Sequence, residues 1–384
     1  MDFVIIQRPI VLRLAVAGLL ISSFFIPYIR RFTVPALPIF TWLITFYACQ
    51  FIPLDYRPHH IFVNILPTLE RILYGASLSE IISQHTHPIL DVLAWLPYGV
   101  IHFSFPFILA LCLFVFGPPG CVATFGQAFG FMNIAGVLTQ LLFPNASPWY
   151  EMSYGSAPAD YSIPGEAGGL ARIDKILGLN LYGSTFGTSP LVFGAFPSLH
   201  SGSATIEMLF LVYLCPKLWP LGIAYTMWLW WSTMYLTHHY LIDLVGGSIY
   251  AFLTFFVARQ YLPRVRMEAK TRLAYFGVNK IGIPAFFYSI EPSKPSFVSL
   301  QDDEEALLSK EYNPDKQTDE MSEAPLNLDF VPLRLRRTDS DNDSLVLSPA
   351  SLTSGTSSAT NSEPTSPVTP HSPMSFRLPY GEKP

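Results

Sequence analysis

Long runs of apolar residues, separated by short polar segments, occupy most of the chain up to about residue 263. A helix needs roughly 17 to 25 mainly apolar residues to cross the hydrocarbon core of a membrane. The pattern therefore predicts an all-α, polytopic transmembrane helical bundle of about six to seven crossings. The firmest predicted crossings are residues 34–53, 96–116, 121–143, 203–218 and 219–236, followed by one that begins near 241 and ends near 263.

Composition agrees with this pattern and narrows the class of protein. Of 384 residues, 50% are hydrophobic, 15% are aromatic and only 13% are charged, which is too apolar for a soluble globular protein of this size. The formal net charge of -5 supplies no basic surface, and no nucleic-acid motif occurs, so nucleic acid is excluded as a partner. The four cysteines lie in apolar runs, so no disulfide framework is predicted.

Changes in composition predict four parts of the chain. Residues 1–33 form an N-terminal apolar segment, and residues 34–263 form a membrane-embedded domain that carries the candidate catalytic residues. Residues 264–290 form a basic juxtamembrane segment, which the positive-inside rule places in the cytosol. Residues 291–384 are rich in Ser, Thr, Pro and acids and poor in apolar residues, which predicts a disordered cytosolic tail.

An ionisable pair stands at the start of the last apolar run. His239 and Asp243 are four residues apart, so on a helix they share a face, and the carboxylate can hold one imidazole nitrogen and raise the basicity of the other. His238 points about 100° away from that face. Ionisable residues at the edge of the hydrocarbon are candidates for function. The alternative is a polar pair that only ties two helices together.

A second polar stretch opens the apolar run before it. Pro197 suits the first turn of a helix, and the unpaired amides that follow would form an anion site, with the hydroxyls of Ser198 and Ser201 as extra donors. His200, in the same turn, could share a proton with that anion. The alternative is an ordinary capped helix that happens to contain a histidine.

Two crossings separate these stretches, so the chain returns to the same side of the membrane between them. His200, His239 and Asp243 are therefore expected to meet at one mouth of the bundle as the catalytic residues.

The connection from Pro144 to Phe196 is long for a loop in a compact bundle, which is typical of a functional segment. Its first residues include Asn145, Trp149 and Tyr150, which we expect to contact substrate; an interfacial aromatic belt is the alternative for the two aromatic residues. Arg172 and Lys175 are its only fixed cations and are candidate phosphate ligands.

Histidines also occur in the polar span of residues 55–91, where they invite a metal interpretation. No cysteine or second acidic cluster accompanies them at ligand spacing, so neither a metal nor another cofactor is predicted.

The sequence Pro-Ser-Leu-His at 197–200, followed by His-x-x-x-Asp at 239–243, resembles the second and third signatures of the type 2 phosphatidic acid phosphatase superfamily. More closely, Gly194–Gly202 and Met234–Gly247 resemble the fungal inositol phosphorylceramide synthases. The resemblance covers roughly residues 35–263. It implies a helical bundle of that superfamily's architecture in the Golgi membrane, a lumenal active site, a cytosolic tail and an accessory membrane subunit.

The resemblance also implies the reaction. Phosphoinositol would pass from phosphatidylinositol to the primary hydroxyl of ceramide, with release of diacylglycerol. His239 would attack phosphorus while Asp243 orients and charges its imidazole, and His200 would protonate the departing oxygen and then deprotonate ceramide. A direct route in which His239 acts as the base for ceramide stays open.

Two rival functions remain at this point. A lipid phosphate phosphatase on the same scaffold is one, but Ser232 and Thr233 stand where such phosphatases carry Ser-Arg. With fewer cations, a singly charged phosphodiester is easier to hold than a doubly charged monoester. The other is a membrane carrier in which the histidines relay protons.

Overall fold

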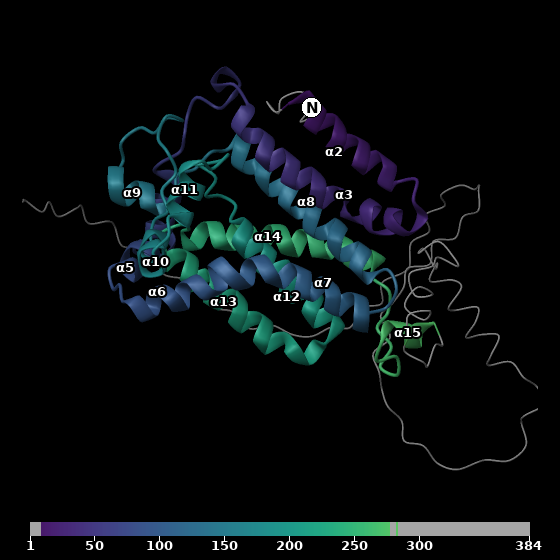
Figure 1. Ribbon diagram of the computed structural model, residues 1–384. Helices are drawn as coiled ribbons and strands as arrows, with labels where there is room; N and C mark the ends of the chain where they lie inside the picture. Colours follow the sequence, from purple (N-terminus) through teal and green to yellow (C-terminus); the bar gives the residue numbers. More distant parts are fainter. Residues whose placement is uncertain (1–8, 277–281, 283–384) are drawn as a thin grey trace, which may run out of the picture. The chain divides into compact units, whose positions relative to one another are not determined.

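The structure is a computed structural model that describes residues 9–276 and 282. The chain divides into two units, Met1–Asn313 and Pro314–Pro384, and the second lies outside the described residues. The predicted tail from residue 291 lies outside them as well. In the described part the regular elements are helices (Figure 1), and two isolated β-bridges pass through Asn145. The prediction of an all-α fold is confirmed.

Within the part of the chain that the structure describes, four helical stretches are long and apolar enough to cross a membrane, so the chain is a multi-pass membrane protein. They are Pro27–Phe51, Pro88–Phe116, Cys121–Leu142 and Leu241–Tyr261. The corresponding helices are α3 (Pro27–Ala48), α6 (Pro88–Trp95) with α7 (His102–Phe116), α8 (Cys121–Leu142) and α14 (Leu241–Ala258). The shorter α2 (Ile10–Ser23), α12 (Leu199–Leu214) and α13 (Trp219–Tyr235) accompany them.

Two helices begin at prolines, earlier in the chain than the apolar pattern predicts. α3 begins at Pro27, where the missing N–H of a first-turn proline costs nothing. The predicted boundary between residues 33 and 34 therefore falls inside this helix. α6 likewise begins at Pro88, and Pro97 is accommodated in the π-helical turn Leu96–Ile101, so α6 and α7 continue as one crossing.

α12 is the central helix of the bundle, and it packs against α7, α8, α13 and α14. Its backbone comes closest to α14, because a Cβ added at Gly247 would lie 2.1 Å from the carbonyl oxygen of Ser198. Only glycine permits this approach. The close crossing brings the first turns of α12 and α14 together at one end of the bundle.

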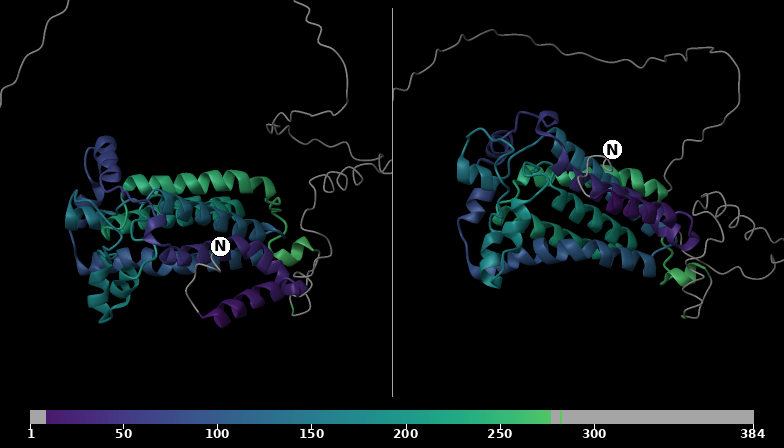
Figure 2. Two further views of the ribbon diagram at one scale, coloured as in Figure 1. Left: turned by 90° about the horizontal axis from the view of Figure 1, so that it is seen from above. Right: turned by 45° about the horizontal axis from the view of Figure 1, so that its top comes forward.

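α3 lies along α8, and a Cβ added at Gly130 would meet the backbone of Pro38 and Ile39 at 2.5 Å. α2 packs against α3 at the edge of the bundle, where Figure 2 shows it apart from the other helices.

Connecting segments gather at the end where α12 and α14 begin (Figure 1). One segment carries α4 (Ile65–Tyr74) and α5 (Leu78–Ser83), and the long loop 144–196 carries α9 (Pro148–Tyr154), α10 (Leu170–Leu177) and α11 (Leu181–Gly187). A short α15 (Arg272–Tyr275) follows the last crossing. The segments at this end hold the turns that carry the two sequence motifs.

Candidate active site

His239 and Asp243 are in contact, although not on one helical face. α14 begins only at Leu241, so His239 precedes the helix while Asp243 lies in its first turn. The Nδ1 atom of His239 is 2.9 Å from Oδ2 of Asp243, and Asp243 is fully buried. A left-handed backbone conformation at Thr237, with φ 64°, accompanies the turn that leads His239 back over the start of the helix.

The long loop holds this turn through backbone contacts. The amides of Trp149 and Gly169 donate to the carbonyl oxygens of Thr237 and Leu236, each at 3.0 Å. His238 is directed to the same loop, where its Nε2 lies 3.1 Å from the carbonyl oxygen of Ala167. His238 therefore stays off the contact between His239 and Asp243, as the sequence predicts.

His200 meets the pair from α12. Its Nδ1 is 3.1 Å from Nε2 of His239, so the two motifs share one mouth of the bundle and that prediction is confirmed. α12 begins at Leu199 with Ser198 as its N-cap. The prediction that Pro197 lies in the first turn of this helix is wrong, because the proline precedes the N-cap residue Ser198.

Two further rings complete the site, and the sequence analysis did not single them out. Tyr98 stacks on His200 with ring centroids 4.6 Å apart, and His102 lies 4.7 Å from the same ring. Both belong to the crossing Pro88–Phe116, in or just after its π-helical turn. Polar residues inside an apolar run, next to a π-turn, are the signal that could have identified them.

Burial sets the charge state of His239. His239 is 5% exposed, and burial lowers the pKa of its imidazole. The ring is therefore neutral at physiological pH, which leaves a lone pair for reaction. With Nδ1 held by Asp243, the nitrogen that carries that lone pair to a substrate is Nε2, which points toward His200.

Glu70 supports the same segment from α4. Its Oε1 accepts the first amide of α14, that of Leu241, at 2.7 Å, while its Oε2 is buried and has no partner among the described residues. Burial, with Asp243 nearby, raises the pKa of Glu70 to about 7. The sequence analysis gave Glu70 no role, because a lone acid in a polar span carries no motif.

The serine hydroxyls expected at an anion site are used inside the protein. Oγ of Ser198 accepts the amide of Ser201 at 3.3 Å as the helix cap. Oγ of Ser201 donates to the carbonyl oxygen of Leu244 at 2.6 Å and accepts Nε1 of Trp230 at 2.8 Å. Both side chains are fully buried. The Ser198 hydroxyl therefore caps α12 and the Ser201 hydroxyl joins α12 to α13 and α14, and neither serine lines the cavity described below, so neither is placed to donate to a phosphate there.

The two expected cations also lie away from the histidines. Nε of Arg172 donates to Asp91 at 2.7 Å, and its guanidinium lies over the ring of Tyr235. Lys175 is exposed on α10. Neither lines the cavity described below, so we remove both from the candidate phosphate ligands.

In the first part of the long loop, one of the expected substrate contacts lines the cavity and the other two hold the loop in place. Trp149 is 4% exposed and lines the cavity. Asn145 instead bridges two backbone segments, and the hydroxyl of Tyr150 donates to the carbonyl oxygen of Ala157 at 3.0 Å. Of the three expected substrate contacts, only Trp149 borders the space that a substrate could occupy.

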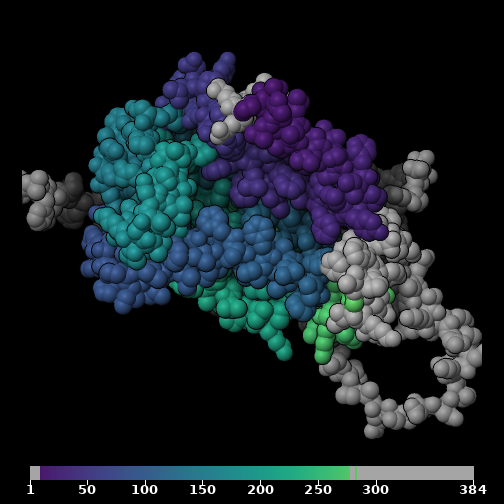
Figure 3. All heavy atoms as spheres, viewed as in Figure 1, coloured from purple at the N-terminus to yellow at the C-terminus, as the bar shows by residue number. Residues whose placement is uncertain are grey.

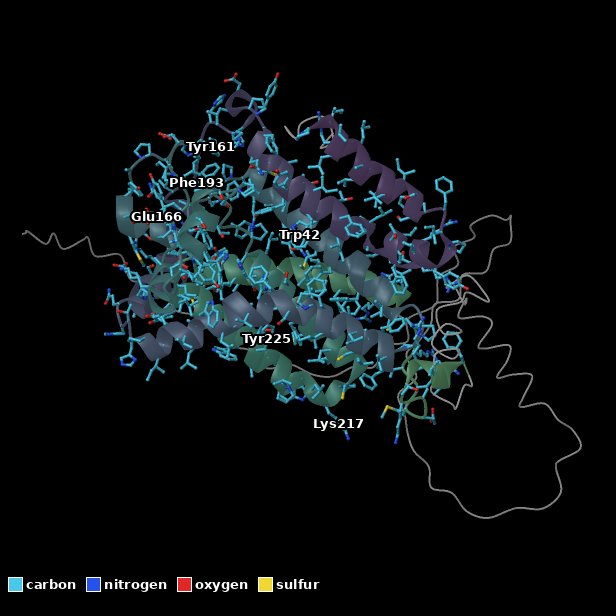
Figure 4. The ribbon with its side chains drawn as sticks, viewed as in Figure 1. Trp42, Tyr161, Glu166, Phe193, Lys217 and Tyr225 are labelled. Carbon is cyan, nitrogen blue, oxygen red and sulfur yellow. The ribbon has the colours of Figure 1, made fainter. Side chains whose placement is uncertain are left out.

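A cavity of about 2310 Å³ begins at the histidines and extends through the bundle. His200, His238 and His239 line one end, and Arg264 and Arg266, which follow the last crossing, line the other. The walls between are mainly aromatic and aliphatic residues of α3, α7 and α8. Figure 3 shows the surface hollowed between α3 (purple) and α7 (blue), and Figure 4 labels Trp42 and Glu166, which both line the cavity.

The cavity is larger than the roughly 300 to 1,000 Å³ of ordinary small-molecule sites. Its apolar length and polar end match a lipid whose head group reaches the histidines. Among the described residues, no three His, Cys, Asp or Glu side chains are grouped so that they could hold a metal ion.

A family model described as the PAP2 superfamily matches residues 66–257. The chain is 46% identical to inositol phosphorylceramide synthase of Candida albicans over 310 residues, which are 80% of this chain and 64% of that protein. It is 48% identical to inositol phosphorylceramide synthase catalytic subunit aur1 of Schizosaccharomyces pombe, over 68% of this chain and 62% of that protein.

A third relative is covered more fully. The chain is 45% identical to inositol phosphorylceramide synthase catalytic subunit AUR1 of Saccharomyces cerevisiae, over 79% of this chain and 75% of that protein. The chain thus spans less than two thirds of the Candida and Schizosaccharomyces relatives and three quarters of the Saccharomyces one. No solved structure matches the chain.

Proposed function

Because the chain belongs to the PAP2 superfamily and, within it, to the family of fungal inositol phosphorylceramide synthases, we propose that it is a phosphotransferase of sphingolipid synthesis. It transfers phosphoinositol from phosphatidylinositol to the primary hydroxyl of ceramide and releases diacylglycerol. The observation that carries this proposal is the 3.1 Å approach of His200 and His239, with Asp243 behind, at the polar end of a lipid-sized cavity.

The facing nitrogens suit an in-line displacement. The two nitrogens are 3.1 Å apart, within hydrogen-bond distance, so the rings must separate to admit a phosphorus atom, which Nε2 of His239 then approaches on one side while the leaving oxygen points toward Nδ1 of His200 on the other. In the first step the N–P bond forms, the bond from phosphorus to the diacylglycerol oxygen breaks, and His200 donates a proton to that oxygen. Asp243 stabilises the positive charge that develops on His239.

The second step reverses these roles. His200 takes the proton of the ceramide hydroxyl, the ceramide oxygen attacks phosphorus, and the N–P bond breaks to restore His239. One phosphate ester is exchanged for another, so the reaction needs no external oxidant or nucleotide. Trp149 lines the same end and is positioned to contact the head group.

The phosphate is held with little fixed positive charge. Among the described residues that line the cavity, the arginines belong to the start of α3 and to the segment after α14, away from the histidines. The first-turn amides of α12 and its dipole supply the stabilisation at the reactive end. A singly charged phosphodiester is tolerated there more readily than a doubly charged monoester, which favours transfer over phosphate release.

The orientation follows from the basic residues. Arg264 and Arg266 follow the last crossing and Arg259 lies at its end, whereas His239 precedes it. The positive-inside rule supports a cytosolic position for the arginines and a lumenal one for the histidines. The Golgi membrane as the location is proposed from the family resemblance alone. Two relatives are named catalytic subunits, which supports an accessory membrane subunit for this chain too.

A choice between substrates tests the function. The chain is expressed in membranes that have no such activity of their own. These membranes are then given either labelled phosphatidylinositol plus ceramide, or labelled phosphatidic acid. We expect inositol phosphorylceramide and diacylglycerol in equal amounts from the first mixture, and phosphate release from the second at the level of a His239→Ala control. Rapid phosphate release with no transfer to ceramide would instead identify a lipid phosphate phosphatase.

A further inference from the structure

Besides Nδ1 of His102, which lies next to His200, two buried polar atoms in the cavity wall have no hydrogen-bond partner among the described residues. One is Nε1 of Trp42 on α3, which can only donate, and the other is Oδ1 of Asn133 on α8, which can only accept. Both residues line the cavity. Asn133 is fully buried, and its Nδ2 already donates to the carbonyl oxygen of Phe129 at 2.8 Å.

The register of α3 and α8 brings the two side chains to the same level. Gly126 lies against Pro35, and Gly130 lies against Ile39, so the two helices advance together. Continuing this register by three residues brings Trp42 beside Asn133. The indole of Trp42, which Figure 4 labels, packs edge-on against Phe129 with ring centroids 5.9 Å apart. Phe129 lies one turn before Asn133 on α8.

This level is also the level of the reactive histidines. A Cβ added at Gly136 would meet the side chain of Leu199, and one added at Gly202 would meet Met132 at 3.3 Å. The turn of α8 that contains Asn133 therefore lies beside the first turn of α12, which carries His200. Trp42 and Asn133 therefore line the cavity at the level of the end that His200 also lines.

An unpaired donor and an unpaired acceptor in an apolar, membrane-embedded wall are costly unless a ligand satisfies them. Together they complement a secondary amide, which offers one N–H and one carbonyl oxygen. Of the two substrates, ceramide has such an amide, on the carbon next to the one that bears its reacting hydroxyl. Phosphatidylinositol has ester carbonyls in its lipid backbone and no N–H.

We propose that Trp42 and Asn133 form the amide-recognition site for ceramide, a role that rests on the proposed function. The ceramide N–H donates to Oδ1 of Asn133, and the ceramide carbonyl accepts from Nε1 of Trp42. The pair selects the lipid that accepts phosphoinositol and leaves the phosphatidylinositol step unaffected. Diacylglycerol has ester carbonyls but no amide N–H, so it leaves Oδ1 of Asn133 without a donor and is held less well than ceramide.

The test combines variants with altered substrates in the full-length, membrane-embedded protein. Trp42→Phe removes the indole N–H and keeps an aromatic ring, whereas Asn133→Leu removes Oδ1 together with Nδ2, which bonds the carbonyl oxygen of Phe129, and puts an apolar side chain of similar size in their place. Each is expected to lower kcat/KM for ceramide about tenfold, the effect of one lost neutral hydrogen bond. KM for phosphatidylinositol is expected to stay within about twofold of wild type. Trp228→Phe is the matched control, because its indole bonds Leu93 outside the cavity.

Ceramide methylated at the amide nitrogen separates recognition from a structural role. If the two residues only stabilised the fold, methylation would not change the difference in kcat/KM between wild type and the variants. Wild type is expected to use it about tenfold less well than ceramide, whereas Asn133→Leu, which has no acceptor left, is expected to use both alike. Equal use of the two lipids by wild type overturns the inference, and this measurement needs no variant to fold. Equal losses for ceramide and phosphatidylinositol in the variants overturn it as well. If wild type transfers nothing to either lipid, the proposed function itself is wrong.

Discussion

Asp243 determines which nitrogen of His239 a substrate meets. Its Oδ2 holds Nδ1 at 2.9 Å, so Nε2 faces His200. Asp243→Asn keeps the size of the side chain but removes the charge that stabilises the ring when it becomes positive. We expect transfer to fall at least about 100-fold, and His239→Ala to abolish it, when activity is measured per molecule of purified protein. Near-normal transfer by either variant would contradict the assignment.

Glu70 is expected to make the stability of the protein depend on pH. Burial raises the pKa of Glu70 to about 7, above that of an unfolded glutamate, so folding favours its protonated form. The stability it contributes is present at low pH and is lost as pH rises through about 7. The melting temperature of wild type is therefore expected to fall between pH 5 and pH 8 by more than that of Glu70→Gln, which cannot ionise.

Glu70→Ala separates the hydrogen bond from the charge. Glutamine can still accept the amide of Leu241, whereas alanine leaves that buried donor unpaired at a cost of about 1 to 3 kcal/mol. The alanine variant is expected to melt below the glutamine variant at every pH. A wild type and Glu70→Gln with parallel pH profiles would show that Glu70 does not titrate in this range.

The sequence predicted which residues are in contact better than it predicted the backbone geometry that brings them together. The four-residue spacing identified the partner of His239, although the contact forms across a helix start rather than along one face. The hydroxyl of Ser201 could not be assigned, because its partners Leu244 and Trp230 are distant in sequence. Asn133 gave no signal, because its meaning depends on the cavity it lines.

At the scale of elements, the crossing of α12 and α14 controls the distance between the motifs. A Cβ at Gly247 would lie 2.1 Å from the carbonyl oxygen of Ser198, the residue that caps α12. Gly247→Ala must push the helices apart, with a cost of about 1 to 3 kcal/mol for overpacking. We expect a lower melting temperature and a larger relative loss of transfer, because His200 and His239 separate with the helices.

Gly187→Ala is the matched control, because nothing lies within 4 Å of a Cβ at that position and the residue has ordinary backbone angles. Its melting temperature and transfer are expected to match wild type. Equal behaviour of the two variants would mean that the bundle tolerates a wider crossing and that the close approach does not set the geometry of the site.

Apolar run length predicted the major helices because a membrane fixes the length that a helix must have. It could not place the starts of α3 and α6, where Pro27 and Pro88 begin helices ahead of the apolar runs. The arrangement of the long loop was also beyond prediction, since α9, α10 and α11 are short and are positioned by contacts with distant segments.

At the scale of the whole molecule, the chemistry belongs to the membrane domain. The proposed catalytic residues all precede Gly247, and the cavity is lined by residues up to Phe276. A chain truncated after Ile290 is expected to keep its turnover, with transfer per molecule measured in detergent. A fall of more than about tenfold, or roughly 1.4 kcal/mol in the barrier, would mean that the tail takes part in catalysis.

The central claim is that phosphoinositol passes through His239 to ceramide. The most direct measurement incubates the protein with head-group-labelled phosphatidylinositol in the absence of ceramide, quenches it with base, and locates the label. We predict label on His239 of wild type, absent from His239→Ala, and lost on addition of ceramide as inositol phosphorylceramide forms. Label that persists in His239→Ala, or ceramide product that forms without any labelled protein, would contradict this account.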